Sequence, residues 1–395
     1  MSEWKKVKLG DYCEITSSKR CLASVRSKNG IPFFCSKEII CLDKGEDFEP
    51  TDFIPEELYN DIKAKYGVPT GGDLLLTTRG TNGIPYIYKP SDKFYFADGN
   101  LSWFKNFGKE LSPQYLYYWF KSPLGIHEVD AISKGTAQKA VPIDGLRRIV
   151  LLTPSLHTQN RIVVILSRYD SLIENYQKQI KLLEEAAQRL YKEWFVDLRF
   201  PGHENTKIVD GVPEGWEKKK LIDLVDVQYG YAFDGHLFNS KEEGTPIVRI
   251  RNIPDGYTND YTTEEASESY IINDGDILVG MDGIFHINTW SGGKAFLVQR
   301  ACSFRPKDDS MKGFILQAIY EPIKFFENTV VGATVAHLGK KHIDSIELLV
   351  SKNVSLYKPF EKMFNERQTL KSQLRLLTEA RDRLLPKLMS GEITV

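Results

Sequence analysis

Two stretches of the chain carry apolar residues in heptads, with steps that alternate between four and three residues. The first stripe consists of Ile162, Leu166, Tyr169, Ile173, Tyr176, Ile180, Leu183, Ala187, Leu190 and Trp194. The second consists of Leu356, Phe360, Met363, Arg367, Leu370, Leu374, Leu377, Arg381, Leu384 and Leu388, in which only the arginines are polar. Heptads sustained over this length predict two long helices packed as a coiled coil. Two separate amphipathic helices, each lying on its own domain, remain the alternative.

The pattern before each helix is different. Short β-branched and aromatic runs, punctuated by Gly, Pro, Asn and Asp, predict strands at residues 74–78, 86–88, 247–250 and 277–279. One aromatic-rich helix is expected in each half, near residues 113–122 and 312–326. Each half therefore begins with a small domain of mixed α and β structure.

The two halves are copies of one unit. The segment WKKVKLGDYCEI from Trp4 returns as WEKKKLIDLVDV from Trp216, and GGDLLLTTRG around Asp73 returns as DGDILVGMDG around Asp276. Further matches join residues 133–152 to 330–349, and the two heptad stretches to each other. The offset between copies shrinks through the globular part and is nearly constant in the helices. The copies thus differ by loop-sized deletions, which is expected where surface loops carry specificity.

The repeat predicts an α+β protein with pseudo-twofold internal symmetry. We expect globular domains at residues 1–152 and 198–350, and long helices at 153–197 and 351–395. Domain ends often lie close together, in which case the second helix returns along the first. The two helices would then form an antiparallel coiled coil.

Composition sets limits on function without naming one. The chain has 395 residues and a net charge of −1, so any basic surface must be local. No signal sequence or membrane-spanning run is visible, which predicts a cytoplasmic protein. The five cysteines lack metal-site spacing and are expected to be free thiols, and no metal site is predicted.

Four short segments carry a resemblance to a known family. They are TPSLHTQNRI from Thr153, WFVDLRFPGHE from Trp194, DGVPEGW from Asp210 and LLPKLMSGEI from Leu384. In this order on a two-copy chain, they resemble the specificity subunits of type I restriction–modification systems. The second copy departs from the pattern, because residues 332–335 and 351–357 lack the forms found at 135–138 and 153–162.

The resemblance implies a DNA-binding role without catalysis. It implies two target-recognition domains, each reading one half of a bipartite, asymmetric duplex DNA target, with the helices as the spacer between them. The implied partners are two methyltransferase subunits and endonuclease (translocase) subunits. S-adenosylmethionine, ATP and magnesium would be bound by these partners, and no cofactor by this chain.

Loops between strands are the expected carriers of DNA contacts, because Arg, Asn, Gln and Lys read base edges and bind phosphates. In the first copy the candidates are Ser36, Lys37, Arg79, Thr81, Asn82, Lys134, Thr136, Gln138 and Lys139. In the second copy they are Arg249, Arg251, Asn252, Asp282, Phe285, His286, Asn288, Trp290, Gln299 and Arg300. Arg249 and Arg251 are expected to alternate along a strand and to face the same way. Residues 282–290 of the second copy correspond to the loop 79–82 of the first and are expected to form a loop as well. Since these two loops differ in chemistry, the two half-sites should differ in sequence.

Two other functions compete with this interpretation. The near-neutral charge fits a coiled-coil scaffold that binds proteins and no DNA. Asp210, Glu217 and Lys219 have the acid-x-Lys arrangement of metal-dependent nucleases, although such spacing recurs freely in a charged chain. Neither a glycine-rich cofactor turn nor an Asn-Pro-Pro-aromatic motif of a methyltransferase is present.

Overall fold

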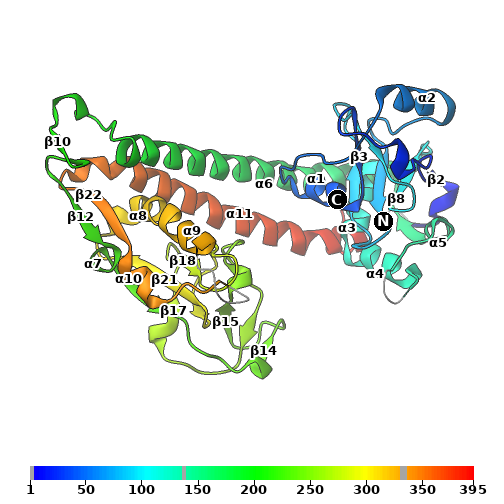
Figure 1. Cartoon of the computed structure of the whole chain (residues 1–395). Coiled ribbons are helices and arrows are strands. Elements are labelled where there is room, and N and C mark those ends of the chain that lie inside the picture. The colour runs from blue at the N-terminus through cyan, green and yellow to red at the C-terminus, as the bar shows by residue number, and fades with distance from the viewer. Residues whose placement is uncertain (1–3, 136–138, 330–335) are drawn as a thin grey trace. The chain divides into compact units, whose positions relative to one another are not determined.

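The computed structural model describes residues 4–135, 139–329 and 336–395, and the chain divides into two compact units (Figure 1). The first unit comprises residues 1–174 and 378–395, and the second comprises residues 175–377. Two long helices, α6 (Leu156–Tyr191) and α11 (Lys358–Ser390), contribute one segment each to both units. Each unit therefore combines a globular domain with two helix segments.

The first unit is built on two small sheets. A four-stranded antiparallel sheet has the order β2-β8-β5-β6, and a three-stranded sheet has the order β4-β3-β7 with β3 and β7 parallel. The strands are β1 (Lys5–Lys8), β2 (Glu14–Thr16), β3 (Ile31–Phe34), β4 (Phe53–Ile54), β5 (Leu74–Thr77), β6 (Pro85–Ile87), β7 (Tyr95–Phe96), β8 (Leu101–Lys105) and β9 (Val150–Thr153). The shorter helices are α1 (Ser36–Lys44), α2 (Glu56–Tyr66), α3 (Pro113–Lys121), α4 (Pro123–Ile132) and α5 (Ile143–Arg148).

The second unit repeats this plan. Its sheets have the orders β13-β21-β18-β19 and β14-β16-β15-β20-β17, with β15 and β20 parallel. The strands are β10 (Ile208–Val209), β11 (Val212–Pro213), β12 (Trp216–Lys220), β13 (Val225–Tyr229), β14 (Phe238–Asn239), β15 (Thr245–Val248), β16 (Tyr261–Thr262), β17 (Ile271–Ile272), β18 (Ile277–Gly280), β19 (Ile287–Thr289), β20 (Ala295–Leu297), β21 (Ala301–Pro306) and β22 (Glu347–Ser351). The shorter helices are α7 (Leu221–Leu224), α8 (Lys312–Ala318), α9 (Tyr320–Thr329) and α10 (Lys340–Ser345).

Register confirms the internal repeat at the level of single residues. In the first unit Leu74 of β5 lies opposite Phe104, and in the second Ile277 of β18 lies opposite Phe304. The repeat also extends to the first and last strands of each domain, because β1 pairs with β9 as β12 pairs with β22. The sequence matches therefore correspond to equivalent strands.

The aromatic-rich helix expected near residues 113–122 is confirmed as α3, although a second helix, α4, follows it at once. The single helix expected near residues 312–326 is wrong, because two helices, α8 and α9, divide that stretch. In the first unit the break falls at Ser122–Pro123, where proline lacks the amide hydrogen that would continue the helix. The Ser122 side chain instead accepts a hydrogen bond from the Gly125 amide and caps α4. In the second unit α8 ends at Ala318 and α9 begins at Tyr320.

The heptad stripes predict the helix packing correctly within each unit. Every stripe residue is buried or half-buried, including Arg367 and Arg381. In the second unit Glu184 contacts Arg367, and Trp194 contacts Phe360. From the first contact to the second, the residue number rises by ten along the first helical segment and falls by seven along α11. The two helix segments of this unit therefore run antiparallel.

In the first unit, Ile162 and Leu166 near the start of α6 share a core with Leu388 near the end of α11. The second unit has the corresponding arrangement around Phe360. There Gly313 of α8 lies so close to the α11 backbone that a Cβ would meet the Phe360 carbonyl oxygen at 2.2 Å. Glycine is required at this contact because any side chain would separate the two helices.

A different side chain anchors the start of each long helix. Gln159 in α6 is fully buried, accepts from the Ser112 amide and donates to the carbonyls of Glu110 and Pro154. The second copy has no glutamine there. Its Tyr357, just before α11, bonds through its hydroxyl to both the amide and the carbonyl of Ser351. Both devices satisfy buried backbone groups where a strand gives way to a helix.

Candidate nucleic-acid interface

In the first unit, backbone hydrogen bonds to two different segments fix the start of the loop that follows β5. The Thr78 amide donates to the Asn100 carbonyl at 2.8 Å, and the Val141 amide donates to the Thr78 carbonyl at 2.9 Å. The next residue, Arg79, forms an antiparallel bridge with Ala140, and its side chain is exposed. A left-handed Gly80, with φ of 81°, then turns the chain back.

This framework brings together the three candidate segments of the first copy. Ser36 at the start of α1 donates from its hydroxyl to the Arg79 carbonyl at 3.0 Å. Asn82 donates from Nδ2 to the Lys139 carbonyl at 3.2 Å, and Lys134 bridges Ala140 through two backbone hydrogen bonds. Ser36 and Asn82 thus hold the loop through hydrogen bonds to its backbone. The remaining described candidates have exposed side chains: Lys37, Arg79, Thr81, Lys134 and Lys139. Thr136 and Gln138 lie outside the described residues.

In the second unit, the same framework carries a different set of side chains. The Met281 amide donates to the Arg300 carbonyl at 2.8 Å, and Asp282 forms the antiparallel bridge, in this case with His337. The Asp282 carboxylate pairs with Arg300 Nη1 at 2.9 Å and with His337 Nδ1 at 2.5 Å. The candidates Asp282 and Arg300 therefore lie together, and Gln299 beside them is exposed.

His337 is not among the candidates that the sequence suggests. Its position was nevertheless accessible, because the match between residues 133–152 and 330–349 aligns His337 with Ala140. The signal is an imidazole at a position where the first copy has an alanine. Glu327 of α9 is a second residue not anticipated. It accepts from the Phe285 amide at 2.6 Å and from Lys324, and so fixes the loop that Asp282 begins.

Burial alone would raise the pKa of the Glu327 carboxyl, but hydrogen bonds from Lys324 and the Phe285 amide outweigh it and hold the pKa below its ordinary value. The carboxylate is therefore charged at neutral pH and restrains the loop through an ionic hydrogen bond.

Three candidates in the second copy are wrong because their side chains face the protein interior. Phe285 and Trp290 are fully buried, and the Trp290 indole donates to the Gly293 carbonyl. Asn288 donates to the carbonyls of Ile253 and Pro254 and accepts from cationic side chains of α11. The expectation of one continuous loop at residues 282–290 is therefore wrong, because residues 287–289 form strand β19. His286, which is half-buried, stays a prediction.

The expectation that Arg249 and Arg251 alternate along a strand is also wrong. Strand β15 ends at Val248, and residues 250–252 form a turn of 3-10 helix. Arg251 and Asn252 both donate to the Asp260 carboxylate, while the Arg249 guanidinium lies over the Phe238 ring, 5.4 Å from its centre. Burial alone would raise the pKa of Asp260, but the hydrogen bonds from Arg251 and Asn252 outweigh burial, so the pKa lies below its ordinary value. Any DNA contact by these residues would compete with that network.

The residues of the proposed nuclease motif do not form such a site. Glu217 on β12 pairs with Lys219 two residues away at 3.1 Å, and Asp210 occupies the exposed turn between β10 and β11. Across the described ranges, no three His, Cys, Asp or Glu side chains gather as metal ligands. Among these same residues, no helix has the length and apolar character needed to cross a membrane.

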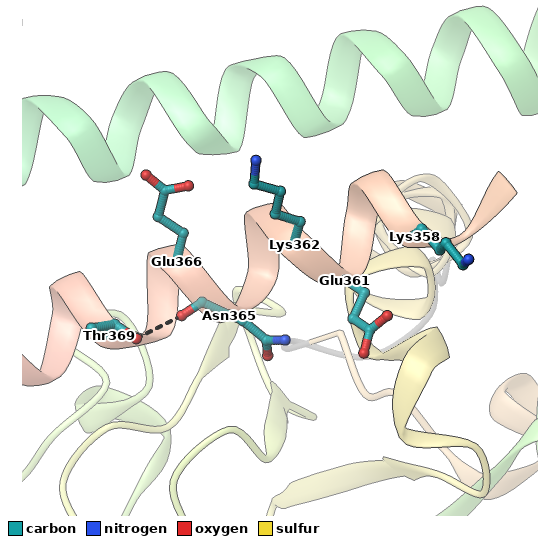
Figure 2. A pocket seen from close by; sticks show the side chains of 6 residues that line it. All are labelled: Lys358, Glu361, Lys362, Asn365, Glu366 and Thr369. Atoms are coloured by element: carbon teal, nitrogen blue, oxygen red, sulfur yellow. Dashed lines mark hydrogen bonds between the residues drawn. The ribbon is translucent and has the colours of Figure 1, made fainter. Parts of the chain in front are cut away.

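One hollow of the second unit is formed by a single helix. Its lining comes entirely from α11: Lys358, Glu361, Lys362, Asn365, Glu366 and Thr369. Figure 2 shows that Lys362 and Glu366 point toward α6, whereas Glu361 and Asn365 point away from it. The side chains do not converge on a common point, so the hollow lacks the arrangement of a small-molecule site.

The family description "type I restriction modification DNA specificity domain" matches residues 1–185 and again residues 213–351. The chain belongs to this family. Its two matches to the specificity domain correspond to the two copies found in the sequence and in the sheets.

Curated relatives of the family are similar over most of the chain. The MjaIX specificity subunit of Methanocaldococcus jannaschii is 28% identical over 303 residues, which cover 71% of this chain and 69% of that protein. The HindI specificity subunit of Haemophilus influenzae is 21% identical with full coverage of both chains. Among solved structures, the S subunit of the M. genitalium type I system shares the fold, with a TM-score of 0.59, 17% identity and coverage of 98% of this chain and 96% of that one.

Proposed function

We propose that this specificity-family chain is the DNA-reading subunit of a type I restriction–modification complex, with one domain for each half of a bipartite, asymmetric duplex target. The observation that carries the proposal is the pair of equivalent loops with unlike chemistry. One framework of strands and bridges presents Arg79 in the first unit and Asp282 with Arg300 in the second. Two similar scaffolds with different loops are suited to reading two different sequences.

The catalytic steps belong, in this proposal, to partner subunits. Two methyltransferase subunits would bring S-adenosylmethionine, and endonuclease (translocase) subunits would bring ATP and magnesium. The two long helices carry exposed apolar side chains, including Leu172, Leu182 and Leu376, which such partners would cover. A complex of this kind acts where a prokaryote keeps its DNA, in the cytoplasm.

Co-expression with the cognate methyltransferase, followed by genome-wide mapping of modified bases, tests the proposal. The expected result is one motif of two short, unlike half-sites separated by a fixed gap. A continuous motif, or no modification with the chain present and folded, would contradict it. Omission of this chain from the co-expression is the control, because the methyltransferase alone should then leave the motif unmodified.

Binding assays separate the proposal from the two competing functions. Affinity for a duplex carrying the motif should fall steeply as salt rises, since phosphate contacts release counterions. A protein-binding scaffold would show no such dependence. Magnesium-dependent cleavage of DNA by the purified chain alone would favour the nuclease.

A further inference from the structure

The equivalence of the two loops can be established from backbone hydrogen bonds without reference to side chains. In the first unit the amide of Thr78 binds the Asn100 carbonyl, and in the second the amide of Met281 binds the Arg300 carbonyl, both at 2.8 Å. Asn100 and Arg300 therefore occupy corresponding positions.

The next residues correspond as well. Arg79 bridges Ala140 in the first unit, and Asp282 bridges His337 in the second. On the far side of each bridge, an amide donates back to the residue that precedes the loop: Val141 to Thr78 and Leu338 to Met281.

The side chains at these corresponding positions differ in charge. The first unit has a cation at residue 79 and a neutral amide at residue 100. The second unit has an anion at residue 282 and a cation at residue 300. Each unit therefore presents one guanidinium, but from a different position of the same framework.

The Asp282 carboxylate lies beneath two exposed groups. Its side chain is 17% exposed, against 68% for Arg300 and 60% for His337, and each carboxylate oxygen contacts one of them. A carboxylate next to a duplex would repel the phosphates, and its pairing with two donors offsets that cost. The arrangement leaves the outer faces of the guanidinium and the imidazole free of the aspartate.

Arg300 adopts an unfavourable backbone conformation to reach this place. Its φ is 69°, in the left-handed region that bulky residues rarely occupy. An exposed ion pair contributes little to stability, so the pair with Asp282 does not by itself account for an arginine in that conformation. Strained residues of this kind gather at ligand sites.

We propose that Arg300 reads a guanine in the second half-site and that Asp282, bound on its other oxygen by His337, is the positioning residue that orients the guanidinium. A guanidinium held in one plane can donate to O6 and N7 of guanine together. The inference rests on the proposed function, and it assigns to Arg300 in the second domain the same base-reading role that we propose for Arg79 in the first.

Competition binding with single-base-pair variants of the motif, in the complex with the methyltransferase, tests this inference. In Arg300→Lys the charge remains but the bidentate geometry is lost, so discrimination at one G·C pair of the second half-site should fall about 10-fold to 100-fold. Asp282→Asn should relax the same base pair while the first half-site stays unchanged. Lys218→Ala, an exposed cation on β12, is the matched control and should leave discrimination unchanged at every position.

A further variant separates recognition from folding. Glycine adopts the left-handed conformation without strain, so Arg300→Gly should melt at the same temperature as the wild type or higher, and still lose discrimination at that base pair.

Three outcomes would overturn the inference. They are unchanged half-site recognition in Asp282→Asn, tighter binding of that variant to all sequences alike, and loss at the first half-site. The second outcome would identify Asp282 as a residue that holds Arg300 away from DNA. If the wild-type complex itself modifies no bipartite motif, the proposed function fails. That result is seen without any of these variants, so it is distinguishable from a failure of the inference about Arg300.

Discussion

The guanidinium of Arg367 on α11 donates from Nε to the Glu184 carboxylate on α6 at 2.6 Å, and its other nitrogens donate to Thr289 and Asn288 of β19. One side chain thus joins both helices of the second unit to its recognition domain. Arg367 is also one of the two polar residues that interrupt the second heptad stripe. Its side chain is buried and each of the three guanidinium nitrogens donates a hydrogen bond, which explains why a charged residue is tolerated at a position where the pattern expects an apolar one.

We expect Arg367 and Glu184 to be energetically coupled. A double-mutant cycle with Arg367→Met and Glu184→Gln should give a coupling of about 1–2 kcal/mol in the free energy of unfolding, because the cation is buried while the carboxylate is partly exposed. The neighbouring pair Arg189–Glu185 is the control. Its arginine is 81% exposed, so its coupling should stay below about 0.5 kcal/mol. Equal couplings for the two pairs would contradict a structural role for Arg367.

One turn further along α11, Lys371 extends this polar contact. Its Nζ donates to the Thr289 carbonyl, to Asn288 Oδ1 and to Thr289 Oγ1, and the side chain is buried. Burial, reinforced by the nearby Arg367, places the pKa of Lys371 well below the ordinary lysine value. In the window between the lowered pKa and the ordinary one, the native protein binds fewer protons at this residue than the unfolded chain does.

The sign of the effect on stability follows from that difference. Because the unfolded chain binds more protons in this window, the contribution of Lys371 to the free energy of unfolding increases as pH rises. Denaturant unfolding at several pH values up to about 10 should therefore show the wild type gaining on Lys371→Met as pH increases. Lys362→Met, at an exposed position of the same helix, controls for the loss of a lysine. A difference that is flat or decreases with pH would show that Lys371 does not titrate as described.

The contacts of Arg367 and Lys371 also show where sequence reasoning stops. The helices were predictable because their stripes repeat over many residues, and the duplication because strands such as β5 and β18 retain their pattern. The inward contacts of Asn288 were not, because they depend on Arg367 and Lys371 of α11, which lies far away in the sequence. A polar residue in a short segment looks the same whether it faces a helix or solvent, so local pattern alone assigned Asn288 to the DNA-contacting loop.

The candidate site divides in the same way. Arg79 and Asp282 could be aligned from the repeat, and the structure places both on equivalent bridges. The ion pairs of Asp282 with Arg300 and His337 join three separate segments, and no periodicity relates them. Arg251 illustrates the converse case, since its partner Asp260 is only nine residues away but turns an apparent DNA contact into an internal one.

Arg79→Ala should affect one half-site alone. The exposed guanidinium belongs to the first unit and is expected to donate to O6 and N7 of one guanine. Its removal should therefore lower discrimination at one G·C pair of the first half-site by about 10-fold to 100-fold. Arg79→Lys retains the charge and should restore overall affinity without restoring discrimination. Methylation rates on duplexes with each base pair substituted in turn measure both effects. Loss at the second half-site would reverse the assignment of domains to half-sites.

The final prediction concerns the spacer between the half-sites, for which the proposed function assigns the two long helices. Insertion of one heptad after Gln179 and one after Gln373 preserves the phase of both apolar stripes, because seven residues return a coiled-coil position to itself. Seven residues add about 10 Å of helix, which corresponds to about three base pairs of duplex. The modified motif should therefore keep both half-sites and gain about three base pairs between them.

Insertion of five residues at the same two points is the matched control. It lengthens each helix by about 7.5 Å but rotates the following part of each stripe by about 140°, so it should lower the melting temperature and abolish modification instead of lengthening the gap. Genome-wide mapping of modified bases reads out both variants. A seven-residue variant that folds and methylates with an unchanged gap would show that the helices do not set the spacing, and one with altered half-sites would show that they do more than set it.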